Sequence, residues 1–131
     1  MGLDISLRFR NKDARKIGED DGRPIYNECD VYLCDTSFCG RSAFACVREW
    51  VGDDRYGTFI PLDGEDFDAF CAAVSNGLAA ENILMSANDI FETLDSKRIN
   101  NFSLADLYAF VLKSKPIADK LGWYLEIECD W

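Results

Sequence analysis

The sequences MGLDISLRFR (residues 1–10) and WYLEIECDW (residues 123–131) carry the same pattern near the two ends of the chain. In each, apolar side chains alternate with polar ones, which predicts a strand that is buried on one face only. A strand needs a partner for its backbone N–H and C=O groups. We therefore expect both terminal strands in one antiparallel sheet, where they can be neighbours, with the helices packed on the apolar face.

Charged residues of the two terminal strands fall on the other face of this sheet. If the strands are neighbours, Arg8 and Arg10 are able to face Glu126 and Glu128 across it. Opposite charges on neighbouring strands attract, so this arrangement favours the same pairing.

The first residues also have a second interpretation. Gly2 followed by Leu3, Asp4, Ile5 and Ser6 fits the pattern for N-terminal myristoylation. A single acyl chain anchors only marginally, and a strand that starts at Leu3 explains the alternation better. No apolar run approaches the ~20 residues of a membrane-spanning helix, and the N-terminus lacks an apolar secretory signal. We expect a cytoplasmic protein without a membrane partner.

Apolar spacing predicts the elements between the terminal strands. Residues 11–24 are rich in charge and predict an exposed loop, and Pro61 confines a short strand at 58–62 to an edge or end. The remaining expected elements are a strand within 26–34, helices at 43–51, 63–80 and 81–99, the third of them broken near Ser86, and a last helix that starts at Ser103 and that Lys115-Pro116 ends or kinks.

These elements predict one α+β domain over residues 1–131. Its small antiparallel sheet includes both terminal strands, and three to four helices pack on one face. Phe70 belongs to the expected core because it lies on the apolar stripe of the helix at 63–80.

Several kinds of chemistry have no basis in the sequence. The chain has no His, which removes the commonest general base and metal ligand, and it has no glycine-rich phosphate loop. The spacing of Cys29, Cys34, Cys39 and Cys46 lacks the short C-x-x-C pairs of zinc sites. We expect reduced cysteines, no metal, no cofactor and no catalytic residues.

The charge balance points to a partner instead. The chain holds 24 acidic and 14 basic residues, a net charge of −10. This excess disfavours direct nucleic-acid binding and favours basic surfaces. The densest acidic stretch has only Arg55 as a basic residue, and its acids are the candidate partner-binding residues. They are Asp53, Asp54, Asp63, Glu65, Asp66 and Asp68. Around a helix N-terminus the same acids would also stabilise the helix dipole, which is the structural alternative.

The segments MGLDI, FACVREWVGDD and IPLDGEDFDAF together give a resemblance to a group of phage proteins. The chain resembles small uncharacterised bacteriophage and prophage proteins, many of which begin Met-Gly-Leu-Asp and carry an aromatic helix followed by a second helix. The resemblance covers the first half of the chain. It implies a phage or mobile element acting in the bacterial cytoplasm, and it supplies no catalytic residues.

Three hypotheses of function follow. The first is a non-catalytic protein that binds a basic surface of a host protein, as phage inhibitors of nucleic-acid-handling or defence systems do, anti-CRISPR proteins among them. The second is a small enzyme that uses carboxylates or a Cys, which requires several such groups in one pocket. The third is an oligomeric structural or accessory phage protein with an apolar contact patch around Trp123 or Trp131.

Overall fold

The centre of the protein is a four-stranded antiparallel sheet. The structure, a computed structural model, describes residues 3–40, 43–90 and 104–131. The strand order is β4-β1-β6-β5. The strands are β1 (Asp4–Asn11), β4 (Val31–Cys39), β5 (Ile60–Pro61) and β6 (Trp123–Asp130). Together with its helices this sheet confirms the predicted α+β class.

The two terminal strands are neighbours, as their matching patterns predict. β1 and β6 pair along their whole length, with Leu7 opposite Ile127 and Arg8 opposite Glu126. β5 pairs with the side of β6 that faces away from β1, and it forms one edge of the sheet. An edge strand tolerates Pro61, which has no backbone N–H, because no further strand needs that donor. The register therefore places the apolar residues of both strands on one face and the charged ones on the other.

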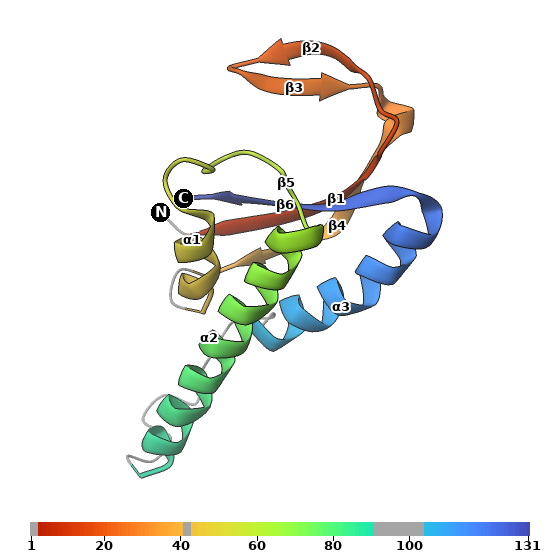
Figure 1. Cartoon of the computed structure of the whole chain (residues 1–131). Coiled ribbons are helices and arrows are strands. Elements are labelled where there is room, and N and C mark those ends of the chain that lie inside the picture. Colours follow the sequence, from red (N-terminus) through yellow and green to blue (C-terminus); the bar gives the residue numbers. More distant parts are fainter. Residues whose placement is uncertain (1–2, 41–42, 91–103) are drawn as a thin grey trace.

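Three helices cover the apolar face of the sheet (Figure 1). They are α1 (Ala45–Val51), α2 (Gly64–Ile90) and α3 (Leu104–Leu121). Leu7 and Ile127 from the sheet are completely buried, and so is Phe70 from α2. Leu107 and Val111 of α3 are buried in the same core.

Two expectations about the helices are wrong. Residues 63–80 and the following segment form one helix, since α2 runs without a break from Gly64 to Ile90. Residues 91–99 of the expected helix lie outside the described residues. So does Ser103, where the next helix was expected to start. The break expected near Ser86 does not occur, because serine is compatible with a helical backbone and α2 continues through this position.

Pro116 does not end the helix, because α3 continues past it to Leu121. A proline inside a helix leaves the carbonyl four residues before it without a backbone donor. Here that carbonyl belongs to Leu112, whose side chain is 46% exposed, so this side of the helix is open to hydration. Buried Val111 and Ala118 hold the opposite side against the core. The helix ends at Gly122, whose φ of 75° suits glycine.

The segment predicted as an exposed loop contains a β-hairpin. Its strands are β2 (Lys16–Asp20) and β3 (Arg23–Tyr26), which pair antiparallel. Asp21 and Gly22 connect them with positive φ values of 52° and 76°, as a type I′ turn requires. The exposure of this segment concealed the hairpin, because both strands lack a buried apolar face.

The hairpin lies on the side of the sheet opposite to the helices (Figure 1). A short 3₁₀ helix, η1 (Glu28–Asp30), leads from it into β4, so Cys29 is not part of the strand that was expected to contain it. No helix among the described residues is long and apolar enough to cross a bilayer.

Candidate functional site

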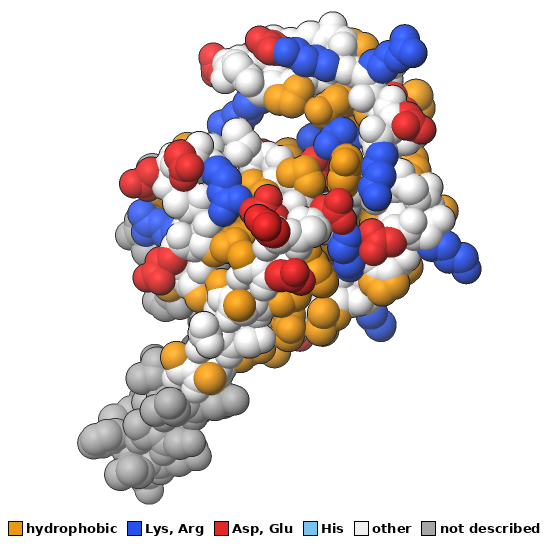
Figure 2. Space-filling model, in the orientation of Figure 1, with side chains coloured by type: hydrophobic (Ala, Val, Ile, Leu, Met, Phe, Trp, Pro, Cys, Tyr) orange, Lys and Arg blue, Asp and Glu red, His pale blue; other side chains and the backbone are white. Residues whose placement is uncertain are grey.

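The predicted acidic residues come together where α1 is connected to α2. We call this surface the acidic corner, and it consists of Asp53, Asp54, Asp63, Glu65, Asp66 and Asp68. Asp53 and Asp54 follow α1, and Asp63 directly precedes α2. Figure 2 shows acidic side chains exposed over α1 and the start of α2. The acids that the sequence places close together therefore lie at both ends of the connection between α1 and α2, and five of the six are exposed.

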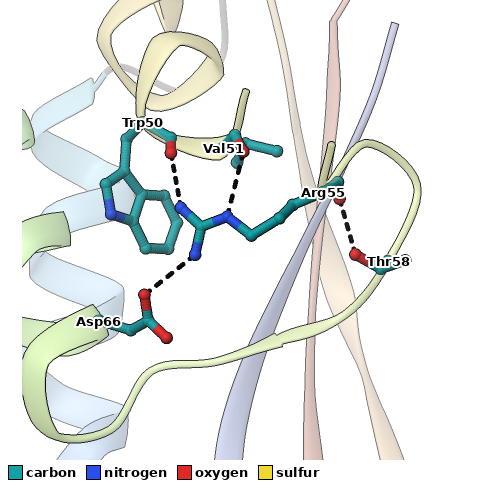
Figure 3. A network of polar contacts seen from close by, with 5 residues as sticks. All are labelled: Trp50, Val51, Arg55, Thr58 and Asp66. Carbon is teal, nitrogen blue, oxygen red and sulfur yellow. Dashed lines mark hydrogen bonds and ion pairs between the residues drawn. The ribbon is translucent and has the colours of Figure 1, made fainter. Parts of the chain in front are cut away.

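Arg55 ties the two halves of the acidic corner to each other (Figure 3). Its Nη1 donates to Oδ1 of Asp66 at 2.9 Å. Its Nη2 and Nε donate to the backbone carbonyls of Trp50 at 2.6 Å and Val51 at 3.1 Å. These carbonyls lie in the last turn of α1, where backbone acceptors lack intrahelical donors. One guanidinium thus joins the end of α1 to the first turn of α2.

Two further contacts fix the same connection. The guanidinium of Arg55 stacks over the Trp50 ring, 4.7 Å from its centroid. The Thr58 hydroxyl donates to the carbonyl oxygen of Arg55 at 2.7 Å, as Figure 3 shows. The turn that carries Asp53 and Asp54 is therefore held on both sides.

A lysine that the sequence analysis did not consider belongs to the acidic corner. Nζ of Lys115 in α3 contacts Oδ1 of Asp63 at 2.9 Å and Oδ1 of Asp119 at 2.8 Å. The hydrogen bond from Lys115 holds the pKa of Asp63 below its usual value. Lys115 lies 52 positions from Asp63 in the sequence, so the pattern of neighbouring residues does not indicate this contact.

The six acids therefore differ in what they can offer a partner. Asp63 and Asp66 already have cationic neighbours in the chain. The others are exposed, and they are Asp53, Asp54, Glu65 and Asp68. The corner as a whole keeps an excess of negative charge at its surface.

A second candidate region, absent from the sequence analysis, lies beneath the hairpin. A partly open cavity of about 450 Å³ lies between the hairpin, the outer face of the sheet and residues 57–61. We call it the hairpin pocket, and its lining includes Arg8, Arg10, Arg23, Tyr26, Phe59 and Glu128. Figure 2 shows the opening beneath the hairpin, with Lys and Arg side chains around it.

The floor of the hairpin pocket is a buried carboxylate shared by two arginines. Nε of Arg8 donates to Oε1 of Glu126 at 2.8 Å, and Nε of Arg10 donates to Oε2 at 3.1 Å. The Glu126 side chain is only 2% exposed. A buried charge needs such partners, since desolvation otherwise disfavours it. The predicted pairing of these arginines with Glu126 is confirmed.

Aromatic rings hold the two guanidinium groups in place. Arg8 lies over the Phe59 ring at 3.8 Å from its centroid. Arg10 lies 4.9 Å from the centroid of Tyr26 and 4.8 Å from that of Tyr124. Stacked, ion-paired guanidinium groups lose little further freedom when they bind a ligand.

The hairpin closes against the body of the protein at Gly57. A Cβ atom at this position would clash with Nη2 of Arg23, and the φ of 70° also favours glycine. Gly57 is moreover held by its N–H, which donates to the carbonyl oxygen of Cys129 at 2.9 Å. The end of the Arg23 side chain, which comes from the hairpin, therefore lies beside the backbone of Gly57.

Three of the thiols that the enzyme hypothesis could use are not activated. Burial raises the pKa of Cys71, and it raises the pKa of Cys129 to about 12. A hydrogen bond with Asp4 raises the pKa of Cys39. Thiols with raised pKa values are protonated at neutral pH and are poor nucleophiles. Among the side chains that the structure describes, no group of three or more Cys, Asp or Glu is arranged to hold a metal ion.

The aromatic patch of the oligomer hypothesis is partly used within the chain. The ring of Trp131 lies 4.7 Å from that of Tyr56 and beneath the guanidinium of Arg48. Both Trp123 and Trp131 are half-buried. Neither tryptophan therefore presents a fully exposed ring for an apolar contact.

Comparisons with protein-family models, with curated proteins and with solved structures find no match for this chain. The resemblance to phage proteins is therefore still a prediction. What the chain does has to be inferred from its own two candidate regions, the acidic corner and the hairpin pocket.

Proposed function

We propose that the chain is a non-catalytic binding protein whose acidic corner contacts a positively charged surface of a partner protein. The observation that supports this most is the exposure of four acids, two on the connection between α1 and α2 and two at the start of α2, which Arg55 ties together. Exposed charges of one sign raise the rate of association with an oppositely charged surface. They do so without any catalytic group.

The fixed backbone of the acidic corner supports this role. Association costs conformational entropy when loops must become ordered, and a surface that is already ordered avoids that cost. Arg55 donates three hydrogen bonds around the connection, to two carbonyls of α1 and to Asp66 of α2. The acids of the turn are thereby presented in one arrangement.

The setting that we propose is the cytoplasm of a bacterium that carries a phage or prophage. Host proteins that handle nucleic acids present basic surfaces to phosphate groups, and an acidic surface can occupy the same place. An inhibitor of such a system, of the anti-CRISPR kind, fits the net charge of −10 and the resemblance of the first half of the chain.

The test is affinity capture from a bacterial lysate with three forms of the full chain. The corner variant carries Asp54→Lys, Glu65→Lys and Asp68→Lys. The control variant carries the same change of charge away from the corner, with Asp13→Lys, Glu28→Lys and Asp30→Lys. We chose these positions because none of the six makes an ion pair in the described structure.

We expect the unmodified chain and the control variant to retain the same partner, and the corner variant to lose it. The association rate of the purified partner should fall about tenfold or more for the corner variant at low salt, because charge reversal replaces attraction by repulsion. Equal retention by all three forms, or equal loss by both variants, would contradict the proposal.

A further inference from the structure

We infer that the hairpin pocket is a binding site for a small organic oxyanion, a carboxylate or phosphate group attached to a flat apolar body. This inference is independent of the acidic corner, which lies at the α1–α2 connection. The cavity of about 450 Å³ falls within the range of small-molecule sites, roughly 300–1,000 Å³.

The hydrogen-bond donors of the hairpin pocket select an anion. A guanidinium group has five N–H donors, and Nε of both Arg8 and Arg10 is used by Glu126. The terminal Nη groups of these two arginines therefore supply the donors for a ligand, and both side chains line the cavity. Paired N–H groups of this kind match the geometry of carboxylate and phosphate oxygens.

The same contacts disfavour a cation at this floor. Each oxygen of Glu126 already accepts from one arginine. A cationic ligand would have to displace Arg8 or Arg10 from a carboxylate that is 2% exposed. Such displacement would leave a buried guanidinium without its partner, which is costly.

The walls of the hairpin pocket suit a flat, apolar body. Phe59 and Tyr26 flank the guanidinium groups, and Pro24, Ile25 and Pro61 complete the apolar lining. Pockets for small molecules combine such apolar walls with a few fixed polar groups. The rings and prolines here provide the walls, and the two arginines provide the polar groups.

Three acids line this cavity, Asp20, Glu126 and Glu128, and they oppose an anion there. Glu126 is already paired with Arg8 and Arg10, and Glu128 is the partly buried one of the other two. Burial raises its pKa, the charges of Arg23 and Arg8 lower it, and the charge of Asp130 raises it. An anion bound at the arginines would lie in the same cavity as this carboxylate. Removing the charge of Glu128 should therefore strengthen anion binding, while removing the charge of Arg23 should weaken it.

The experiment uses four probes that share a benzene ring and differ in charge. Benzoate and phenyl phosphate carry an oxyanion, benzyl alcohol is neutral, and benzamidine is a cation. Each is titrated into the full chain to about 20 mM, above the ~1 mM dissociation constant expected of so small a ligand. The readout is the pair of Nε–Hε NMR signals of Arg8 and Arg10, which the hydrogen bonds to Glu126 protect from exchange.

We expect at least one of the two oxyanions to shift both arginine signals with saturation, and the neutral and cationic probes to leave them unchanged. Equal effects of benzyl alcohol would show an apolar site without charge selection, and effects of benzamidine alone would show a cation site. Either result, or no shift with any probe, would overturn the inference.

Variants locate the binding in the hairpin pocket. Arg23→Gln should weaken benzoate binding about two- to fivefold, the effect of losing one partly screened charge. The matched control is Arg15→Gln, because Arg15 is an exposed arginine outside the cavity lining. Ile25→Trp should abolish binding by filling the cavity, since Ile25 is 42% exposed and its enlargement leaves the core intact. If Arg15→Gln has the larger effect, or Ile25→Trp binds as well as the unmodified chain, the site is elsewhere and the inference is wrong.

Discussion

The acidic corner and the hairpin pocket both depend on arginines that hold carboxylates, but they do so in opposite surroundings. Arg55 and Asp66 are 31% and 48% exposed, so water screens their attraction. Glu126 is 2% exposed, and the arginines on it are 16% and 13% exposed. We therefore expect the ion pair at the acidic corner to contribute little to the free energy of unfolding, and the ion pairs in the hairpin pocket to matter more for it.

The largest effect should come from the apolar core that both regions share. Phe70 is completely buried in α2, with its ring 5.3 Å from that of Trp50. Phe70→Ala should lower the free energy of unfolding by about 3–5 kcal/mol, because a large cavity remains. Denaturation in urea measures this loss. A midpoint equal to that of the unmodified chain would show that the helix does not pack as described.

The second largest effect should come from the buried carboxylate of the hairpin pocket. Glu126→Gln leaves two partly buried guanidinium groups without a negative partner, and it should cost about 3 kcal/mol of unfolding free energy. Asp66→Asn removes the corresponding charge at the acidic corner. If the two substitutions had equal effects in the same urea experiment, the distinction between the regions would be lost.

Glu128, two residues further along β6, should respond in the opposite direction. Burial raises its pKa in the folded chain above the usual 4.5. The folded chain therefore binds this proton more tightly than the unfolded chain does. The free energy of unfolding falls as the pH rises from the usual pKa of 4.5 through the higher pKa of Glu128 in the folded chain. Glu128→Gln should remove this loss and raise the melting temperature at pH 7. A lower melting temperature for this variant at pH 7 would show that Arg23 and Arg8 outweigh burial.

The smallest effect should appear at the acidic corner. Asp66→Asn weakens one exposed contact with Arg55 and should cost about 0.5 kcal/mol or less. The hydrogen bonds from Arg55 to the carbonyls of Trp50 and Val51 remain. Urea denaturation of Asp66→Asn and of the unmodified chain under the same conditions measures this difference in the free energy of unfolding. A loss above about 2 kcal/mol would mean that the pair is shielded from water like the one in the hairpin pocket.

The difference between the regions also explains what the sequence could predict. The terminal strands and their charged face were predictable because alternation is a local pattern, and Arg8 lies opposite Glu126 as that pattern requires. The acidic corner was visible because its acids are close together in the sequence. Its pairing with Lys115 was not, because no local rule connects positions 63 and 115.

The hairpin pocket could not be derived from local patterns, since four separate segments of the chain line it. One signal for its roof was present, because Asp21-Gly22 is a strong hairpin turn, but the polar strands on both sides obscured it. The end of a helix at Pro116, one of the two outcomes predicted there, does not occur. The helix continues through Pro116, and Val111 and Ala118 are buried against the core on either side of it in the sequence.

The central claim is that the acidic corner attracts a basic partner, and the salt dependence of association tests it most directly. The association rate of the captured partner is measured between about 50 and 500 mM salt for the unmodified chain, the corner variant and the control variant. We predict a steep fall with salt for the unmodified chain and the control variant, and a flat or rising dependence for the corner variant. The same salt dependence for all three proteins would contradict the account.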